Sequence, residues 1–188
     1  MSKKIEIIQT AAELLQIQGY HGTGINEIVE KSKSPKGSIY HYFKAGKDEI
    51  VDEALRYSGS EIANLLKAAA EHSKNAEDFI EIIYDGYCSS LQNSNFTKGC
   101  PVASTALEVS GFNAALSDTV RKIYKEWNEI ITDFLLNSNA AAKKKSDAEQ
   151  TAGVLISLME GALLSARIQK SLKPMKDAKN VSLSLLKK

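Results

Sequence analysis

Residues 32–47 read Ser-Lys-Ser-Pro-Lys-Gly-Ser-Ile-Tyr-His-Tyr-Phe-Lys-Ala-Gly-Lys, and this stretch decides the interpretation of the whole chain. It holds four lysines and no acid, with three aromatic residues among them. Ser34 and Pro35 predict a helix start, because a serine hydroxyl can cap an orphan N–H group and proline is tolerated at the first helical position. Gly37 in the first turn is unfavourable by about 1 kcal/mol relative to alanine, which favours close approach of another surface, such as a phosphate at the helix N-terminus. A short surface helix with solvated lysines is the alternative.

A second short helix precedes this stretch. Apolar residues at helical spacing predict a helix over residues 25–31, and the next helix begins at Pro35. Two short helices joined by a tight turn form a helix-turn-helix, whose second helix enters the DNA major groove with its N-terminal residues foremost. Ile39 and Phe43 would then face the core of the unit. The residues on or beside the outer face would be Lys36, Ser38, Tyr40 and His41.

Three spaced segments resemble the DNA-binding domain of the TetR family of transcriptional regulators. They are Gly-Tyr-His-Gly-Thr-Gly-Ile-Asn-Glu-Ile at 19–28, Pro-Lys-Gly-Ser-Ile-Tyr-His-Tyr-Phe at 35–43, and Lys-Asp-Glu at 47–49. Many relatives have glycine where Ser32 stands and an aliphatic residue where Lys33 stands. The resemblance implies base contacts from Lys36 and Ser38 and backbone approach at Gly37. The phosphate contacts that it implies are Thr23, Lys36, Tyr40, His41 and Lys47.

Length and composition bound the class of protein. With 188 residues and a formal net charge of +1, the chain can form one large or two small helical domains. The basic run coincides with the predicted helix-turn-helix, which favours DNA more than the net charge does. We find no signal peptide, and no run approaches the roughly 18 apolar residues of a membrane span. Cys88 and Cys100 are too few for a disulfide framework. We therefore predict a cytoplasmic protein with two reduced thiols and no membrane partner.

Helical periodicity continues along the chain. A first helix is predicted over 3–18, ended by Gly19, and a long helix over 47–71. Asn75 with Asp78, and a capping box at 146–149, predict two further helix starts. Other helices are predicted at 99–108, at 116–134 and after Pro174, and no clear strand pattern occurs. The prediction is an all-α protein of about nine helices, with an N-terminal three-helix helix-turn-helix DNA-binding domain over 1–46 and a C-terminal helical ligand-binding and dimerisation domain over 47–188.

The sequence offers no positive support for catalysis. It contains no G-x-S-x-G, H-E-x-x-H, Walker loop or C-x-x-C motif. Its three histidines are dispersed, and neither cysteine has a histidine at ligand spacing. We therefore predict a protein that is not an enzyme and has no cofactor and no metal site. Catalysis by residues distant in sequence remains the third-ranked reading.

The helix predicted from residue 146 onward is apolar on more than one face. Such a helix must bury both faces, one inward and one against another subunit, unless it is the central helix of a monomeric bundle. Helix-turn-helix proteins commonly read two half-sites with two-fold symmetry, which favours a homodimer. The predicted interface residues are Leu155, Leu158, Met159, Ala162, Val181 and Leu185.

Aromatic residues in the C-terminal half can either form the core or line a ligand cavity. TetR-family proteins generally bind a small inducer in this region. Gly-Cys-Pro-Val-Ala-Ser at 99–104, with Leu107 and Glu108, resembles the LmrA/YxaF-like subgroup, whose members tend to regulate transporter or detoxification genes and to sense flat, largely apolar compounds. The resemblance places ligand contacts at Phe79, Tyr84, Tyr87, Cys88, Phe112, Tyr124 and Trp127.

These observations predict a transcriptional repressor. It would bind a palindromic operator in double-stranded DNA as a dimer and be released by a small apolar or aromatic effector. The alternative is a helical ligand-binding regulator that acts as an activator or through protein contacts.

Overall fold

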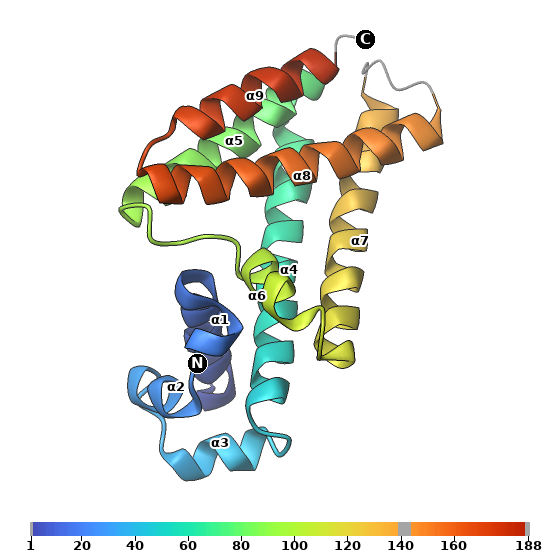
Figure 1. Ribbon diagram of the computed structural model, residues 1–188. Helices are drawn as coiled ribbons and strands as arrows, with labels where there is room; N and C mark the ends of the chain where they lie inside the picture. The colour runs from blue at the N-terminus through green and yellow to red at the C-terminus, as the bar shows by residue number, and fades with distance from the viewer. Residues whose placement is uncertain (1, 139–143, 187–188) are drawn as a thin grey trace. The chain divides into compact units, whose positions relative to one another are not determined.

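The computed structural model of the protein describes residues 2–138 and 144–186. Within these ranges the chain forms nine α-helices and no strand, as the all-α prediction required (Figure 1). Their bounds are α1 Lys3–Gly22, α2 Ile25–Lys31, α3 Lys36–Tyr42, α4 Lys47–His72, α5 Ala76–Asn93, α6 Pro101–Val109, α7 Ala114–Asn137, α8 Lys145–Gln169 and α9 Lys173–Leu185.

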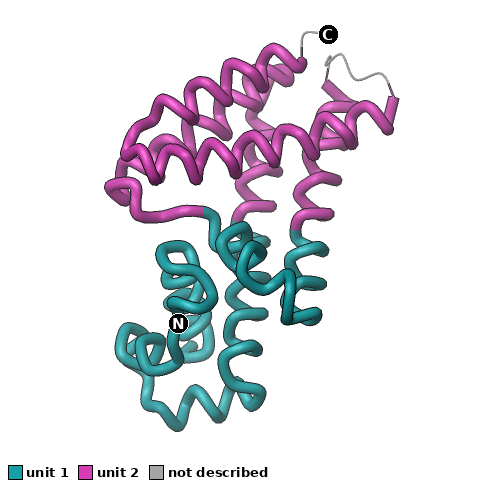
Figure 2. Tube along the Cα trace, viewed as in Figure 1, with its two compact units in different colours: residues 1–61, 100–123 teal, residues 62–99, 124–188 magenta. Residues whose placement is uncertain are grey.

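The chain divides into two compact units (Figure 2). Unit 1 comprises residues 1–61 and 100–123, and unit 2 comprises residues 62–99 and 124–188. Both units are discontinuous in sequence, because α4 and α7 each contribute residues to both. The division at residue 46 proposed from the sequence concerns functional domains rather than contacts, and it stays a prediction.

Unit 1 contains the helix-turn-helix. Ile28 of α2, Ile39 of α3 and Phe43 are fully buried, so the core positions predicted for this motif are confirmed. The predicted start of α3 differs by one residue, because Pro35 occupies the N-cap position and makes no side-chain cap. Ser34 is buried, and its hydroxyl donates to the Ser32 carbonyl at 3.3 Å instead of capping α3. Its hydrogen bond therefore stabilises the turn between the two helices.

Unit 2 is held mainly by apolar packing of α5, α8 and α9. Phe79 stacks on Phe134 of α7 with ring centroids 4.3 Å apart. The predicted cap of α5 is confirmed, since the Asn75 side chain accepts a hydrogen bond from the Asp78 N–H at 2.8 Å. The capping box predicted at 146–149 is wrong: the N-cap is Lys144, two residues before Ser146, and it makes no side-chain cap. The Ser146 hydroxyl bonds instead to the Asp147 carboxylate.

The segment that leads into α6 is held by an arginine. Arg167 of α8 donates from Nη2 to the Thr97 carbonyl at 2.9 Å. Its guanidinium lies so close to Gly99 that a Cβ on this residue would overlap it. Glycine is therefore the residue that fits here without movement of the arginine.

Helix α8 is unusual in composition. By length and apolar content alone it could cross a membrane, whereas the sequence analysis predicted no such segment. Core helices of soluble proteins meet the same criterion, and one such helix is weak support for a membrane location. Only 33% of its most apolar 18-residue window is buried inside the chain. Much of the apolar surface of α8 is therefore free to pack against another molecule.

Candidate functional site

Helix α3 presents a polar and aromatic face to solvent. Ile39, followed four residues later by Phe43, fixes the buried side of the helix, so the intervening side chains point outward. Tyr40 is 51% exposed. Lys36, Gly37 and His41 are also exposed, and Ser38 is half-buried. The structure thus places five of the seven predicted DNA contacts on one short helix.

Gly37 has no packing reason to be glycine. A Cβ at this position would meet no atom within 4 Å in the chain. Its backbone is helical and does not adopt a positive φ. Both observations are compatible with the prediction that another surface approaches the helix here, which would make the missing side chain useful.

The lysines around α3 are free to meet phosphates. Lys33, Lys36 and Lys44 are exposed, and none of them forms an ion pair with another described residue. By contrast, Lys31 on the preceding helix pairs with Glu27 at 2.9 Å. Lys33 has a positive φ of 49°, which turns the chain sharply between α2 and α3. The region therefore carries positive charge with few acids to neutralise it.

Thr23 and Lys47 differ from the residues of α3. Thr23 is fully buried, and its hydroxyl donates to the Gly19 carbonyl at 2.7 Å, so its side chain positions the start of α2. The Lys47 ammonium lies 4.1 Å from the centroid of the Tyr20 ring. Burial lowers the pKa of Lys47, and the carboxylates of Asp48 and Glu108 oppose that shift. The phosphate roles of Thr23 and Lys47 stay predictions.

Sequence reasoning missed a set of contacts that join α6 to the helix-turn-helix. Gly19 was interpreted as a helix stop, whereas α1 continues past it to Gly22 with a break at this residue. Glu108 of α6 accepts a hydrogen bond from the His21 N–H at 2.6 Å. The basic run did not predict a contact with Glu108, because this residue lies more than 60 residues further along the chain.

The predicted ligand residues fall into separate environments. Tyr84 is buried and its hydroxyl shares a hydrogen bond with Ser182 at 2.9 Å, and Phe79 is fully buried, so both have the contacts of core residues. Burial raises the pKa of Tyr84. Tyr87 and Cys88 on α5 are half-buried. Burial also raises the pKa of the Cys88 thiol.

Phe112 belongs to unit 1, whereas the other predicted ligand residues belong to unit 2. It is 57% exposed. Its ring lies against Tyr20 and His21, with centroids 5.8 Å and 5.4 Å away. Phe112 therefore covers the end of α1.

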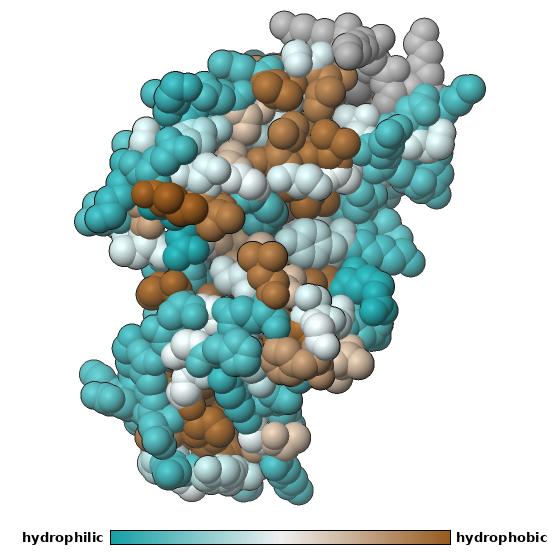
Figure 3. Space-filling view, in the orientation of Figure 1, coloured by the Kyte–Doolittle hydropathy of each residue, from teal (hydrophilic) through white to brown (hydrophobic). Residues whose placement is uncertain are grey.

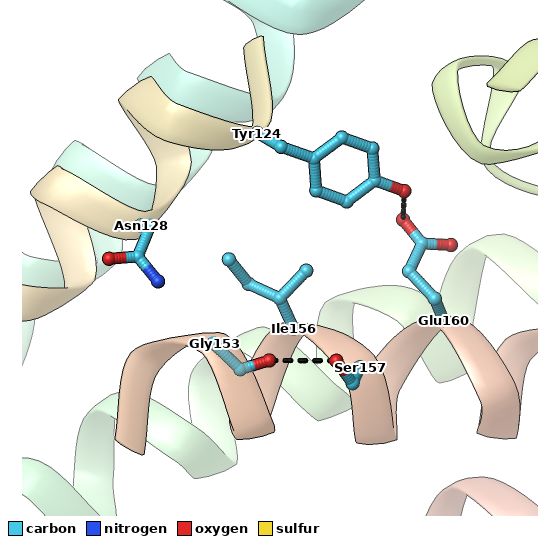
Figure 4. A pocket seen from close by; sticks show the side chains of 6 residues that line it. All are labelled: Tyr124, Asn128, Gly153, Ile156, Ser157 and Glu160. Atoms are coloured by element: carbon cyan, nitrogen blue, oxygen red, sulfur yellow. Dashed lines mark hydrogen bonds between the residues drawn. The ribbon is translucent and has the colours of Figure 1, made fainter. Parts of the chain in front are cut away.

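Unit 2 contains an open pocket of about 300 Å³ between α7 and α8. Tyr124 extends across it, and its hydroxyl donates to Glu160 at 3.5 Å (Figure 4). The Ile156 side chain projects into the same space. The Trp127 ring lies 5.1 Å from the Tyr124 ring. The lining residues are Tyr124, Asn128, Gly153, Ile156, Ser157 and Glu160.

Of the predicted ligand residues, one lines this pocket and one lies beside it. Tyr124 is part of the wall and Trp127 packs against Tyr124. Sequence reasoning missed the polar members, Asn128, Ser157 and Glu160, because it followed apolar and aromatic residues. They could have been predicted from their spacing along α7 and α8 only if it had been known that these two helices face each other.

The strongly exposed apolar residues of α8 and α9 overlap with the predicted subunit interface at Val181. Leu155 and Ala162 are 3% and 7% exposed, so the chain itself already buries them. Leu158, Met159 and Leu185 are half-buried. Apolar side chains gather on the surface of α8 and α9 (Figure 3). The strongly exposed ones on these helices are Val154, Leu164, Ile168 and Val181.

Metal coordination has no candidate in the described part of the chain. No group of three or more His, Cys, Asp or Glu side chains is arranged to hold an ion there.

Comparison with known proteins identifies both halves of the chain. Residues 7–54 match the family of bacterial regulatory proteins called tetR, and residues 76–181 match the C-terminal domain of LmrA/YxaF-like transcriptional regulators. The HTH-type transcriptional regulator YxaF of Bacillus subtilis is 31% identical over 170 residues, which are 90% of this chain and 87% of that protein. LmrA of the same organism is 27% identical, over 97% of this chain and 96% of its own.

A solved TetR transcriptional regulator from Legionella pneumophila has the same fold, with a TM-score of 0.87 at 20% identity over 99% of this chain and 98% of its own. The matched segments cover the basic face of α3 and the helices around the pocket. The chain therefore belongs to the TetR family of bacterial transcriptional regulators, with a DNA-binding helix-turn-helix at its N-terminus and a C-terminal domain of the LmrA/YxaF-like type.

Proposed function

We propose that this protein is a cytoplasmic homodimeric repressor that binds a palindromic operator and is released from it by a small apolar or aromatic effector. The observation that carries the DNA-binding part is the unpaired basic face of α3, on which Lys36 and Tyr40 are exposed beside Gly37. Family and fold are those of transcriptional regulators and not of enzymes. Family members that bind operators as dimers supply the two-fold symmetry that a palindrome requires.

DNA binding can be tested with Lys36→Ala. A band shift on the DNA upstream of the protein's own gene should show weaker binding by the variant, and the salt dependence of log affinity should fall by about one unit because one phosphate contact is lost. Lys74→Ala is the matched control, since Lys74 is an exposed lysine in unit 2. An unchanged affinity and salt dependence for Lys36→Ala would remove α3 from the DNA interface.

A dimer would bury the apolar surface of α8 and α9. Val154, Leu164 and Ile168 are 40%, 50% and 73% exposed on α8, and Gly161 between them leaves open space above the helix. Exposed apolar surface of this kind marks an interaction site in soluble proteins, and a second copy of the chain is the partner that operator symmetry requires.

The effector is proposed to occupy the pocket between α7 and α8. Tyr124 and Ile156 supply its aromatic and apolar walls, and the carboxylate of Glu160 can orient a polar group of the ligand. Trp127 is 3% exposed and packs on Tyr124, so its fluorescence should report entry of a ligand.

A panel of flat aromatic compounds can be screened for those that change Trp127 emission and release DNA over the same concentration range. Tyr124→Ala should bind DNA but lose this response. Tyr87→Ala on α5 should keep it if the pocket between α7 and α8 is the site, and should lose it if the effector binds beside α5 instead. Absence of any compound with both effects would contradict effector release and leave DNA binding intact.

A further inference from the structure

The break in α1 at Gly19 exposes backbone that needs a partner. Gly19 has φ 70° and ψ −170°, a conformation that is essentially reserved for glycine. A Cβ at this position would overlap the Glu108 carboxylate, which lies directly against the glycine. The same carboxylate accepts the hydrogen bond from the His21 N–H at 2.6 Å. An acid on α6 therefore satisfies a donor that the break in α1 leaves without a helical partner.

Residues after Glu108 hold the same end of α1. The Tyr20 hydroxyl donates to Asp48 Oδ1 at 2.6 Å, and the Asn113 amide donates to the other oxygen of that carboxylate at 2.9 Å. The Phe112 ring packs over Tyr20 and His21. We call Glu108, Phe112 and Asn113 the α6 clasp. All three lie in the LmrA/YxaF-like C-terminal match, yet they belong to unit 1 with the helix-turn-helix.

Tyr20 and Gly19 connect the α6 clasp to two predicted DNA contacts, Lys47 and Thr23. The Tyr20 ring lies 4.1 Å below the Lys47 ammonium, and Lys47 is the first residue of α4. The Gly19 carbonyl accepts the Thr23 hydroxyl at 2.7 Å, and Thr23 precedes α2 of the helix-turn-helix. The α1 break therefore adjoins the ring that contacts Lys47, and its carbonyl holds the residue that precedes α2.

We propose that Glu108 is a positioning residue for DNA binding, which acts by fixing the α1 break and, through Tyr20, the ammonium of Lys47. The inference rests on the DNA-binding part of the proposed function and is independent of the effector and of repression. It extends the DNA-binding machinery beyond the helix-turn-helix to a carboxylate supplied by the C-terminal domain.

Two other roles for Glu108 predict different results. If Glu108 acted only as a negative charge near DNA, its removal would strengthen binding, because repulsion of phosphate would fall. If it only stabilised the fold, its removal would lower the melting temperature, and the folded protein would bind DNA as before. A positioning role predicts weaker DNA binding by folded protein, which neither of these roles produces.

The experiment uses the full chain and a DNA duplex selected from a random-sequence library by the wild-type protein. Glu108→Ala should weaken binding of this duplex about tenfold, because DNA binding would then have to supply the free energy of ordering that the hydrogen bond to Glu108 supplies in the wild type. Glu108→Gln should recover most of the affinity, because the amide oxygen can still accept from the His21 N–H. Glu129→Ala is the matched control, since Glu129 is an exposed acid of α7 in unit 2.

Amide hydrogen exchange supplies a readout at the site itself. The His21 amide should exchange faster in Glu108→Ala than in the wild type and Glu108→Gln, while circular dichroism stays the same. If Glu108→Ala does not fold, Phe112→Ala gives the second test, because Phe112 is 57% exposed and its removal opens the clasp without touching the core. This variant should also weaken DNA binding.

The inference is wrong if Glu108→Ala folds and binds the duplex as tightly as the wild type or more tightly. It is equally wrong if Glu108→Gln loses as much affinity as Glu108→Ala, since the acceptor would then be irrelevant. Failure of the wild type to select any duplex would overturn DNA binding and this inference together. Selection by the wild type with full binding by the clasp variants would overturn this inference alone.

Discussion

The two compact units present different surfaces. In unit 1, hydrogen bonds join residues far apart in the chain, such as His21 with Glu108 and Arg56 with Thr119, the latter at 3.1 Å. Unit 2 has bonds of this kind as well, such as that of Tyr84 with Ser182, but it also leaves large apolar side chains on α8 exposed. Directional bonds fix the geometry of a surface that must match DNA, whereas apolar faces suit association with another subunit. Fixed geometry and association therefore place different demands on a helix surface.

Disruption of the proposed dimer at an exposed leucine of α8 should have the greatest effect. Leu164→Arg on α8 should weaken association by roughly 3–5 kcal/mol, because it would bury an unpaired charge in the proposed interface. Leu107→Arg on α6 is the matched control in unit 1, where the leucine is 78% exposed. Light scattering should give twice the chain mass for the wild type and the control, and the chain mass for Leu164→Arg. A wild-type protein that stays monomeric at all concentrations would contradict the dimer.

Two glycine substitutions, one in each unit, should have smaller effects. Gly19→Ala in unit 1 should lower the free energy of unfolding by roughly 3 kcal/mol, because the positive φ is strained for alanine and the Glu108 carboxylate must move. Gly86→Ala on α5 should raise it by about 0.5–1 kcal/mol, since a Cβ there meets open space within a helix. Denaturant titration measures both. Equal effects of the two substitutions would mean that the α1 break is not a fixed feature of the protein.

The smallest effect concerns Tyr20, whose pKa is raised to about 12 by burial and by the hydrogen bond to Asp48. The phenol of the unfolded chain has a pKa of 10.0, so any stability from this shift is present below pH 10 and is lost as the pH rises toward 12. Asp48→Asn should lower the Tyr20 pKa, because it removes the nearby negative charge. Ultraviolet difference titration against Tyr20→Phe measures this. No change in the Tyr20 pKa would contradict the contact between Tyr20 and Asp48.

The helix-turn-helix was predictable because its signals are local. Ile39 and Phe43 lie four residues apart, and both face the core as that spacing predicts. The exposed residues of α3 lie between or beside them, so the sequence alone places them on the outer face. The burial of Thr23, whose hydroxyl donates to the Gly19 carbonyl, could not be predicted in this way, because a short polar side chain carries no sign of its burial.

Unit 2 was harder to predict in detail. Val154 and Leu155 are neighbours on α8, yet Val154 is 40% exposed and Leu155 is 3% exposed. Periodicity identifies two apolar stripes on such a helix but does not say which one packs against its own chain. The polar residues of the pocket were missed for a related reason, since Glu160 meets the predicted Tyr124 only when α7 and α8 come together.

The packing of Arg167 over Gly99 limits which residues related proteins can have at these two positions. Because the guanidinium fills the space in which a Cβ would lie, replacement of Gly99 is compatible with the fold only when the arginine is shortened or redirected. Relatives that lack one of these two residues should therefore tend to lack the other, although the residues stand on separate segments of the chain. Such paired replacement would leave a record of this contact in aligned sequences, and it offers a way to recognise family members that hold the segment before α6 by other means.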